Sequence, residues 1–171
     1  MSIRDCQMQV GHLRSTIIGD CFNRVLSAQG HTVIPQNHIG DWGTQFGMLI
    51  EYIVEKRMDV EDFDLSGVEQ LYQDSKKTFD ADPQFADRAR RRVVKLQGGD
   101  AETLRIWRTL IDISLEGFNA TYARLSVLLT DEDVAGESSY NDDLPRVVDE
   151  LVADALAVED NGALGVIVEA Q

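Results

Sequence analysis

The residue types best suited to chemistry lie near the N-terminus, in the run Gln9-Val10-Gly11-His12. We expect a loop to become a helix here, and a helix N-terminus leaves N–H groups unpaired and concentrates roughly half a positive charge, which binds anions. Gly11 has no side chain, so a nucleotide ring or ribose could lie against its backbone. His12 adds a donor for phosphate oxygens. The run is typical of an ATP site, although a lone Gly-His pair before a helix is more often a structural cap.

Two helices and a strand are expected to position these residues. Apolar residues recur at helical spacing over Gly11–Gln29, which predicts the first helix. The β-branched run in His31–His38 predicts a short strand, with Pro35 at its end or in an edge position. Asp41–Gly43 predicts a turn before a second helix over Thr44–Arg57. A strand after a helix in a unit of about 30 residues indicates a βαβ arrangement, so we expect a parallel sheet.

The middle of the chain predicts helices with recognisable first residues. Ser66 and Glu69 form the pattern of a capping box. Asp82-Pro83 places proline at a first helical position, and Asp100 is expected to cap a long helix. We therefore expect the segment after residue 60 to be mainly helical.

The pattern as a whole predicts an α/β protein in three parts. Residues 1–60 are expected to form the first part of the core, and residues 61–130 a helical segment. Residues 131–171 are expected to contain a helix capped by Asp143 and a strand over 163–169 that lacks partners.

Charge is distributed unevenly along the chain. Residues 1–130 carry 15 basic and 18 acidic side chains, whereas residues 131–171 carry one and 12, so the last part supplies most of the net charge of −14. An acidic surface repels phosphates, so we do not expect RNA binding by the last part. The sequence has neither an apolar run of the ~20 residues that span a membrane nor the apolar core of a signal peptide, and we expect a cytoplasmic protein.

The two cysteines, Cys6 and Cys21, lie in no metal-ligand pattern. The three histidines are scattered, so we expect neither a metal site nor a disulfide framework. Cys21 falls on the apolar stripe of the first helix, where we expect it to be buried.

Several runs of the sequence are distinctive when they are taken together. They are Val10-Gly11-His12-Leu13-Arg14-Ser15-Thr16-Ile17-Ile18-Gly19-Asp20, Gln29–Ile34, Asn37–Ile50 with its Asp41-Trp42-Gly43 turn, Val93–Gln97, Trp107 and Gly136–Tyr140. Across residues 8–168 the chain resembles the arginyl-tRNA synthetases, a class I family.

The resemblance implies a partial Rossmann-type class I synthetase catalytic core with a largely helical insertion. It also implies an ATP-dependent ligase, monomeric as expected for the family, that joins L-arginine to its tRNA through an adenylate, with Mg²⁺ accompanying ATP. The family signature is His-x-Gly-His, whose histidines and glycine lie against ATP, so Gly11 and His12 take the last two roles. Gln9 stands where the family has the first histidine; it keeps an N–H donor but cannot carry charge.

Further candidates follow the predicted strand, near the edge where open α/β sheets usually bind ligands. By the resemblance, Asn37, His38, Asp41 and Trp42 would line the pocket for arginine and the tRNA end. The alternative is structural: Asp41 would cap the next helix and Trp42 would pack in the core.

A basic helix face also admits two interpretations. Arg88, Arg91, Arg92 and Lys95 recur at helical spacing. They could contact tRNA phosphates, or they could form a solvated face or one paired with carboxylates.

We expect the chain to be a fragment that ends before the family's Lys-Met-Ser-Lys-Ser loop, its later arginine-binding strands and its anticodon-binding domain, and therefore to be inactive alone. The alternative is a non-catalytic remnant or paralogue that acts as a protein-interaction module, with Gln9 as a trace of relaxed constraint.

Overall fold

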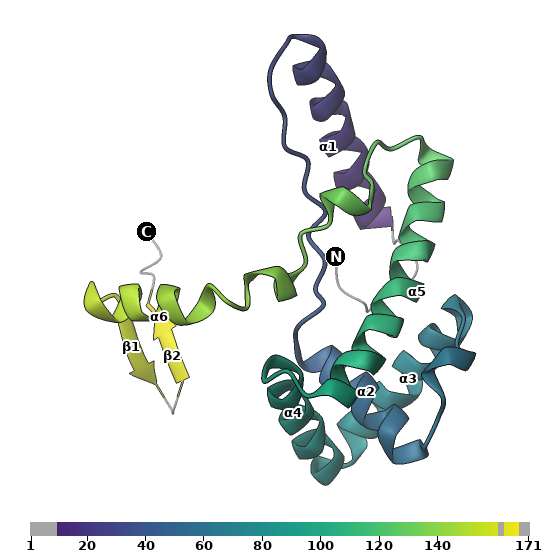
Figure 1. Cartoon of the computed structure of the whole chain (residues 1–171), viewed down its shortest axis with the longest axis vertical. Coiled ribbons are helices and arrows are strands. Elements are labelled where there is room, and N and C mark those ends of the chain that lie inside the picture. The colour runs from purple at the N-terminus through teal and green to yellow at the C-terminus, as the bar shows by residue number, and fades with distance from the viewer. Residues whose placement is uncertain (1–9, 161–162, 168–171) are drawn as a thin grey trace. The chain divides into compact units, whose positions relative to one another are not determined.

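The computed structural model describes residues 10–160 and 163–167. The chain divides into two compact units, one ending at Glu137 and one beginning at Ser138. Figure 1 shows that the first unit is built from helices and connecting segments. Its elements are α1 (Val10–Ala28), α2 (Thr44–Lys56), the 3-10 turn η2 (Val60–Asp62), α3 (Leu65–Ala81), α4 (Pro83–Gln97), α5 (Ala101–Leu125) and the 3-10 turn η3 (Asp131–Asp133). The helices predicted over Gly11–Gln29 and Thr44–Arg57 are formed, as α1 and α2, and α3, α4 and α5 lie in the segment expected to be mainly helical.

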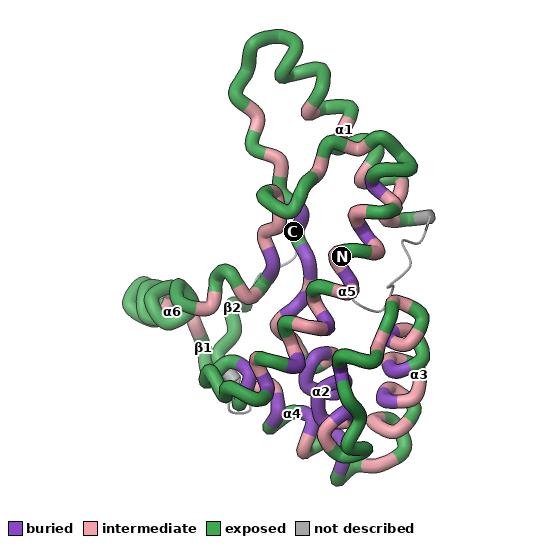
Figure 2. The backbone as a smooth tube through the Cα atoms, turned by 45° about the vertical axis from the view of Figure 1, so that its right-hand side comes forward, coloured by how far each residue is buried: buried purple, intermediate pink, exposed green. Residues whose placement is uncertain are grey.

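Helix α2 is the centre of the hydrophobic core. Phe46, Leu49 and Ile50 have no exposed surface, and the helix packs against α3, α4 and α5. Figure 2 shows the buried residues concentrated on these helices. At Gly47 a β-carbon would lie well inside van der Waals contact with the Ala89 carbonyl, so glycine allows α2 and α4 to approach closely.

Aspartate side chains cap three of these helices. Asp82 and Asp100 accept hydrogen bonds from the N–H groups of Gln84 (2.8 Å) and Thr103 (3.0 Å), as the sequence predicts. The capping prediction at Ser66 is wrong, because α3 already begins at Leu65. Its cap is Asp64, which accepts a hydrogen bond from the N–H of Gly67 at 2.8 Å.

Helix α1 ends as predicted but is not buried as predicted. Gly30 adopts a positive φ of 87°, and the N–H of His31 bonds to the carbonyl of Leu26, which closes the helix C-terminus. None of the described residues of α1 is buried; Phe22 is 62% exposed, and Cys21 is exposed. The prediction that Cys21 is buried is therefore wrong.

The predicted strand over His31–His38 is not formed. Residues 31–36 are extended without ladder hydrogen bonds, and pairing begins only at Asn37, which forms an isolated parallel bridge with Val134. A β-strand is stabilised by backbone hydrogen bonds to a neighbouring strand. Among the described residues, only the short segment 133–137 forms such bonds with the segment that contains Asn37.

The second unit contains a helix and a hairpin. Its elements are α6 (Leu144–Ala153) and the strands β1 (Ala157–Asp160) and β2 (Ala163–Val166). The 3-10 turn η4 (Glu137–Tyr140) spans the boundary between the units in the sequence. The strands are antiparallel, with Ala157 opposite Val166. The sequence prediction of a strand near 163–169 is confirmed over Ala163–Val166, but the prediction that it lacks a partner is wrong. Within the described residues the expected parallel sheet is not formed, and the sheet that is present is this antiparallel pair.

Asp143 precedes α6 at the predicted N-cap position, but its side chain accepts no capping hydrogen bond. The carboxylate instead forms an ion pair with Arg146. The helix start is therefore predicted correctly, whereas the predicted capping interaction is not observed.

Candidate functional site

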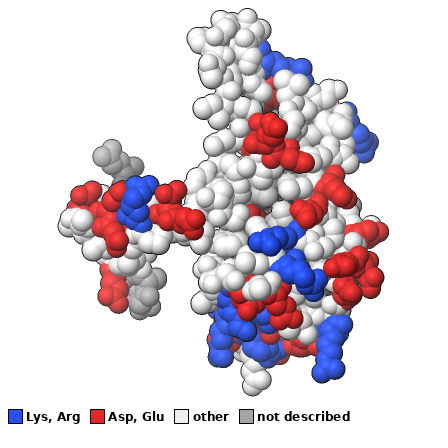
Figure 3. All heavy atoms as spheres, viewed as in Figure 1, with Lys and Arg blue, Asp and Glu red and all other residues white. Residues whose placement is uncertain are grey.

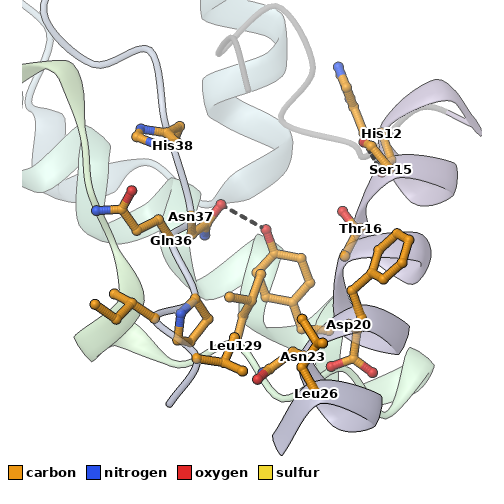
Figure 4. Close-up of a pocket in the computed structure, with 16 residues that line it drawn as sticks. His12, Ser15, Thr16, Asp20, Asn23, Leu26, Gln36, Asn37, His38 and Leu129 are labelled. Atoms are coloured by element: carbon orange, nitrogen blue, oxygen red, sulfur yellow. Dashed lines mark hydrogen bonds between the residues drawn. The ribbon is translucent and has the colours of Figure 1, made fainter. Parts of the chain in front are cut away.

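A cavity of about 410 Å³ lies between α1 and the extended segment that follows it (Figure 4). One wall consists of the α1 residues His12, Ser15, Thr16, Gly19, Asp20, Phe22, Asn23 and Leu26. The opposite wall consists of residues 33–38, with Tyr122 from α5 and Leu129 from the loop after it. Three of the sequence-predicted site residues, His12, Asn37 and His38, are brought together around this space.

The N-terminal end of α1 contributes His12 to the cavity. The Ser15 hydroxyl donates a hydrogen bond to the His12 carbonyl at 3.0 Å, within the first turns of the helix. Gly11 is exposed, and a β-carbon placed on it would meet no atom within 4 Å. The backbone at Gly11 is therefore open to an approaching group, as its proposed role requires. Gln9 lies outside the described residues.

Asn37 is held in the cavity wall by three hydrogen bonds. Its N–H donates to the Asp133 carbonyl at 2.7 Å, and its own carbonyl accepts from the N–H of Ala135 at 3.0 Å. Its side-chain oxygen accepts a hydrogen bond from the Tyr122 hydroxyl at 3.2 Å (dashed in Figure 4). Asn37 and Tyr122 are both buried, whereas the neighbouring His38 is exposed on the cavity wall.

Asp41 and Trp42 do not line this cavity. The Asp41 carbonyl accepts a hydrogen bond from the Trp107 indole N–H at 2.7 Å, and the rings of Trp42 and Trp107 pack edge to face with centroids 5.2 Å apart. Asp41 is buried; the N-cap of α2 is Gly43, so the alternative that Asp41 caps this helix is wrong. The alternative that Trp42 packs against the core is confirmed.

The segment at Gly136 allows Asp41 to be buried. A β-carbon at Gly136 would lie 2.5 Å from Oδ2 of Asp41, a separation that real β-carbons do not adopt. The Trp42 N–H also faces Oε2 of Glu137 at 3.4 Å. Two runs that are distant in the sequence, around Asp41 and around Gly136, therefore pack together.

A polar cluster joins α1 to the loop after α5. Oδ1 of Asp20 accepts from the N–H of Leu128 at 2.8 Å, and Oδ2 accepts from Nε of Arg24 at 2.7 Å. Arg24 also donates to the Ser126 carbonyl. The Arg24 guanidinium, with the Leu128 N–H, holds the pKa of the Asp20 carboxyl below its ordinary value.

Asp20 and Tyr122 are not among the site residues predicted from the sequence. The spacing of Asp20 and Arg24 at i and i+4 was a usable signal for their ion pair. No local pattern indicates the contact of Tyr122 with Asn37, because 85 positions separate the two residues.

The chain matches, over residues 5–171, the family of class I tRNA synthetases (R), catalytic domain. It belongs to this family. The arginine–tRNA ligase of Cutibacterium acnes is 96% identical over 165 residues, which are 96% of this chain and 30% of that protein. The arginine–tRNA ligase of Ectopseudomonas mendocina is 58% identical over 157 residues, 92% of this chain and 27% of that protein. The chain thus spans less than a third of the length of these relatives.

A solved relative has the same fold over nearly the whole chain. The crystal structure of arginyl-tRNA synthetase from Plasmodium falciparum superposes with a TM-score of 0.79 at 36% identity, covering 98% of this chain and 28% of that one. The described residues of this synthetase domain are mostly helical with one small sheet.

The basic face of α4 in this synthetase domain is paired with carboxylates. Nε of Arg92, which is buried, donates to Oε2 of Glu51 at 2.9 Å, and Arg88 contacts Glu51 and Glu55. Arg91 pairs with Asp87 on its own helix. Figure 3 shows acidic and basic side chains interspersed on the visible face around these helices. Arg88, Arg91 and Arg92 therefore agree with the interpretation of a face paired with carboxylates.

The described residues of this synthetase domain contain no group of three or more His, Cys, Asp or Glu side chains that could hold a metal ion. Among the same residues, no helix is both long and apolar enough to cross a membrane.

Proposed function

We propose that this chain is the N-terminal part of the catalytic region of an arginine–tRNA ligase, which activates L-arginine with ATP and transfers it to its tRNA. The observation that carries the proposal is the cavity in which His12 of the signature run faces Asn37 and His38 of the second run. The 96% identity to a protein named arginine–tRNA ligase supports the ligase over a non-catalytic interaction module.

In this proposal ATP binds at the N-terminal end of α1. The helix is 19 residues long, and its N-terminal end offers N–H donors and a partial positive charge to the phosphates. Gly11 leaves the backbone accessible, and His12 donates to a phosphate oxygen. In this proposal Mg²⁺ accompanies ATP.

The reaction places further demands on the same end of the helix. A carboxylate oxygen of arginine attacks the α-phosphorus, and the bond to the leaving pyrophosphate breaks as negative charge moves onto that group. Donors that face this charge stabilise the transition state more than the ground state. Gln9 can donate a neutral hydrogen bond there, whereas a protonated histidine would add charge.

The remaining site assignments also belong to the proposal. Asn37 and His38 contact arginine or the tRNA end, and Asp41 and Trp42 support them through the packing of their turn. The complete enzyme has a Rossmann-type core, with residues 1–60, 61–130 and 131–171 as its first core segment, helical segment and acidic helix–strand segment. It is a monomer that acts in the cytoplasm.

The test uses a hybrid ligase in which residues 8–168 of this chain replace the matching segment of the Cutibacterium acnes ligase, numbered here as in this chain. Arginine-dependent exchange of pyrophosphate into ATP is measured with tRNA present. We expect His12→Ala to lower kcat about 100-fold, as loss of a transition-state donor does. Gln9→His should raise activity several-fold, as expected for about 1 kcal/mol.

His31→Ala is the matched control, because His31 is exposed and does not line the cavity. It should leave exchange unchanged. Equal losses for the alanine variants of His12 and His31, in a hybrid that melts normally, would contradict the proposal. We expect the 171-residue chain by itself to form no arginyl-tRNA.

A further inference from the structure

Tyr122 and Asn37 form a buried contact at the wall of the cavity. Tyr122 is 3% and Asn37 is 8% exposed, and both line the cavity that contains His12. Tyr122 comes from α5, in the helical segment, and its ring packs in a small cluster with Ile39 and Phe118. The packing of the ring therefore holds the Tyr122 hydroxyl in place next to Asn37.

The direction of this hydrogen bond follows from what each group can do. A buried hydroxyl must donate to an acceptor, and within the described residues the side-chain oxygen of Asn37 is the acceptor that Tyr122 reaches, at 3.2 Å. If the Asn37 amide were turned over, its NH₂ group would face the hydroxyl and the phenolic hydrogen would have no acceptor. Burial also raises the pKa of the Tyr122 phenol, so the group stays protonated and keeps donating.

The backbone of Asn37 is fixed as well. Its N–H and carbonyl bond to the Asp133 carbonyl and the Ala135 N–H. With the backbone and the side-chain oxygen both engaged, the NH₂ group is the one part of Asn37 that has no hydrogen-bond partner among the described residues. It lies on a residue that lines the cavity (Figure 4).

We propose that Tyr122 is a positioning residue that orients the Asn37 amide, so that its NH₂ group is presented to the cavity as a donor for an oxygen of a bound substrate. Because the NH₂ group can only donate, its partner on the substrate must be an acceptor: a carboxylate, hydroxyl, carbonyl or phosphate oxygen. Tyr122 does not itself contact the substrate. This inference rests on the proposed function, since it treats the cavity as a substrate site.

The test is a double-mutant cycle in the hybrid ligase, with Asn37→Ala, Tyr122→Phe and the two combined. We expect Asn37→Ala to raise KM for L-arginine or ATP about tenfold. Tyr122→Phe should raise the same KM about fivefold and leave kcat within about twofold, since an unpaired amide rotates away from its donating orientation. In the Asn37→Ala background, Tyr122→Phe should have no further effect on KM.

Tyr52→Phe is the matched control, because Tyr52 lies on α2 and does not line the cavity. It should leave both constants unchanged. An unchanged KM for Tyr122→Phe would overturn the positioning role. The same conclusion would follow if Tyr122→Phe had equal effects in the unmutated hybrid and in the Asn37→Ala background.

A second measurement separates this proposal from the proposed function. If the unmutated hybrid does not activate arginine, the proposed function fails, and the thermal midpoint of the 171-residue chain still tests the contact. Tyr122→Phe and Asn37→Ala should each lower the midpoint by about 2–4 °C, as loss of one hydrogen bond does in a chain of this size. The double variant should fall no further than the larger single loss, and additive shifts would overturn the contact.

Discussion

Helices α1 and α2 differ in how the rest of the chain holds them. Seven of the 13 residues of α2 are buried, whereas none of the described residues of α1 is. The residues proposed to bind ATP therefore lie on an exposed helix. The hydrophobic core that stabilises the fold consists of other residues, which take no part in the proposed chemistry. Local opening should be easiest where few apolar contacts are made, so we expect α1 to open before α2 does.

The polar contacts of the two regions differ in the same way. In the core, the buried Arg92 bonds to Glu51 and also to the Thr103 hydroxyl, at 3.2 Å, which joins α2, α4 and α5. At α1, the cluster of Asp20 and Arg24 bonds mainly to backbone groups of the loop after α5. Breaking the first cluster leaves a charge inside the protein, whereas breaking the second exposes its groups to water.

The largest expected effect comes from the buried pair. Glu51→Ala leaves the Arg92 guanidinium buried without its carboxylate, and we expect a loss of about 3–5 kcal/mol in the free energy of unfolding. The measurement is urea unfolding of the 171-residue chain followed by far-UV circular dichroism. Arg91→Ala is the control: the Arg91 and Asp87 side chains are 75% and 53% exposed. Its loss should be below about 0.5 kcal/mol.

If Glu51→Ala and Arg91→Ala lowered the free energy of unfolding by similar amounts, the buried ion pair of α4 would contribute no more to stability than the exposed one. A Glu51→Gln variant sharpens it further. Glutamine keeps an acceptor for Arg92 but removes the negative charge, so its loss should be intermediate.

Glycine substitutions on the two helices should have opposite signs. Gly47→Ala on α2 forces a methyl group against the Ala89 carbonyl, and we expect a loss of about 1–3 kcal/mol. Gly19→Ala on α1 meets no atom within 4 Å, so the higher helix propensity of alanine should stabilise by about 0.5–1 kcal/mol. Thermal unfolding of both variants tests this. If Gly19→Ala were destabilising, α1 would be packed more closely against its surroundings than its exposed residues indicate.

The same contrast separates what the sequence predicts from what it does not. The helices follow from periodicity and from local capping chemistry, as at Asp82 and Asp100, because both signals act within a few residues. The start of α3 was misplaced because Asp64 and Ser66 are both good caps, and local chemistry does not choose between them. The exposure of Cys21 depends on what packs against α1, and an apolar stripe carries no information about its partner.

The candidate site also contains residues that the sequence predicts and residues that it does not. His12, Asn37 and His38 were recognisable from their runs in the sequence, and they do line one cavity. The strand predicted over His31–His38 is not formed, because strand pairing is non-local and Asn37 pairs with only one short segment among the described residues. Tyr122 was not identified because only the folded chain brings it to Asn37.

The last expected effect concerns how α1 is attached, and it depends on pH. The Asp20 carboxyl has a lowered pKa in the folded chain because Arg24 and the Leu128 N–H favour its charged form. Its contribution is therefore fully present above the unfolded pKa of about 4 and is lost as the pH falls through the lower folded pKa. Asp20→Asn should cost about 1 kcal/mol at pH 7.

Amide hydrogen exchange at Leu128 is the direct measurement, because this N–H donates to Asp20 at 2.8 Å. Protection in the unmutated chain should exceed that in Asp20→Asn about fivefold at pH 7, and the ratio should approach one as the pH falls below about 4 and Asp20 is protonated. Asp87→Asn is the control, since Asp87 pairs with Arg91 on the exposed face of α4. It should leave Leu128 protection unchanged at every pH. A ratio that stays constant with pH would mean that the Asp20 charge does not hold α1, and that its few apolar contacts do.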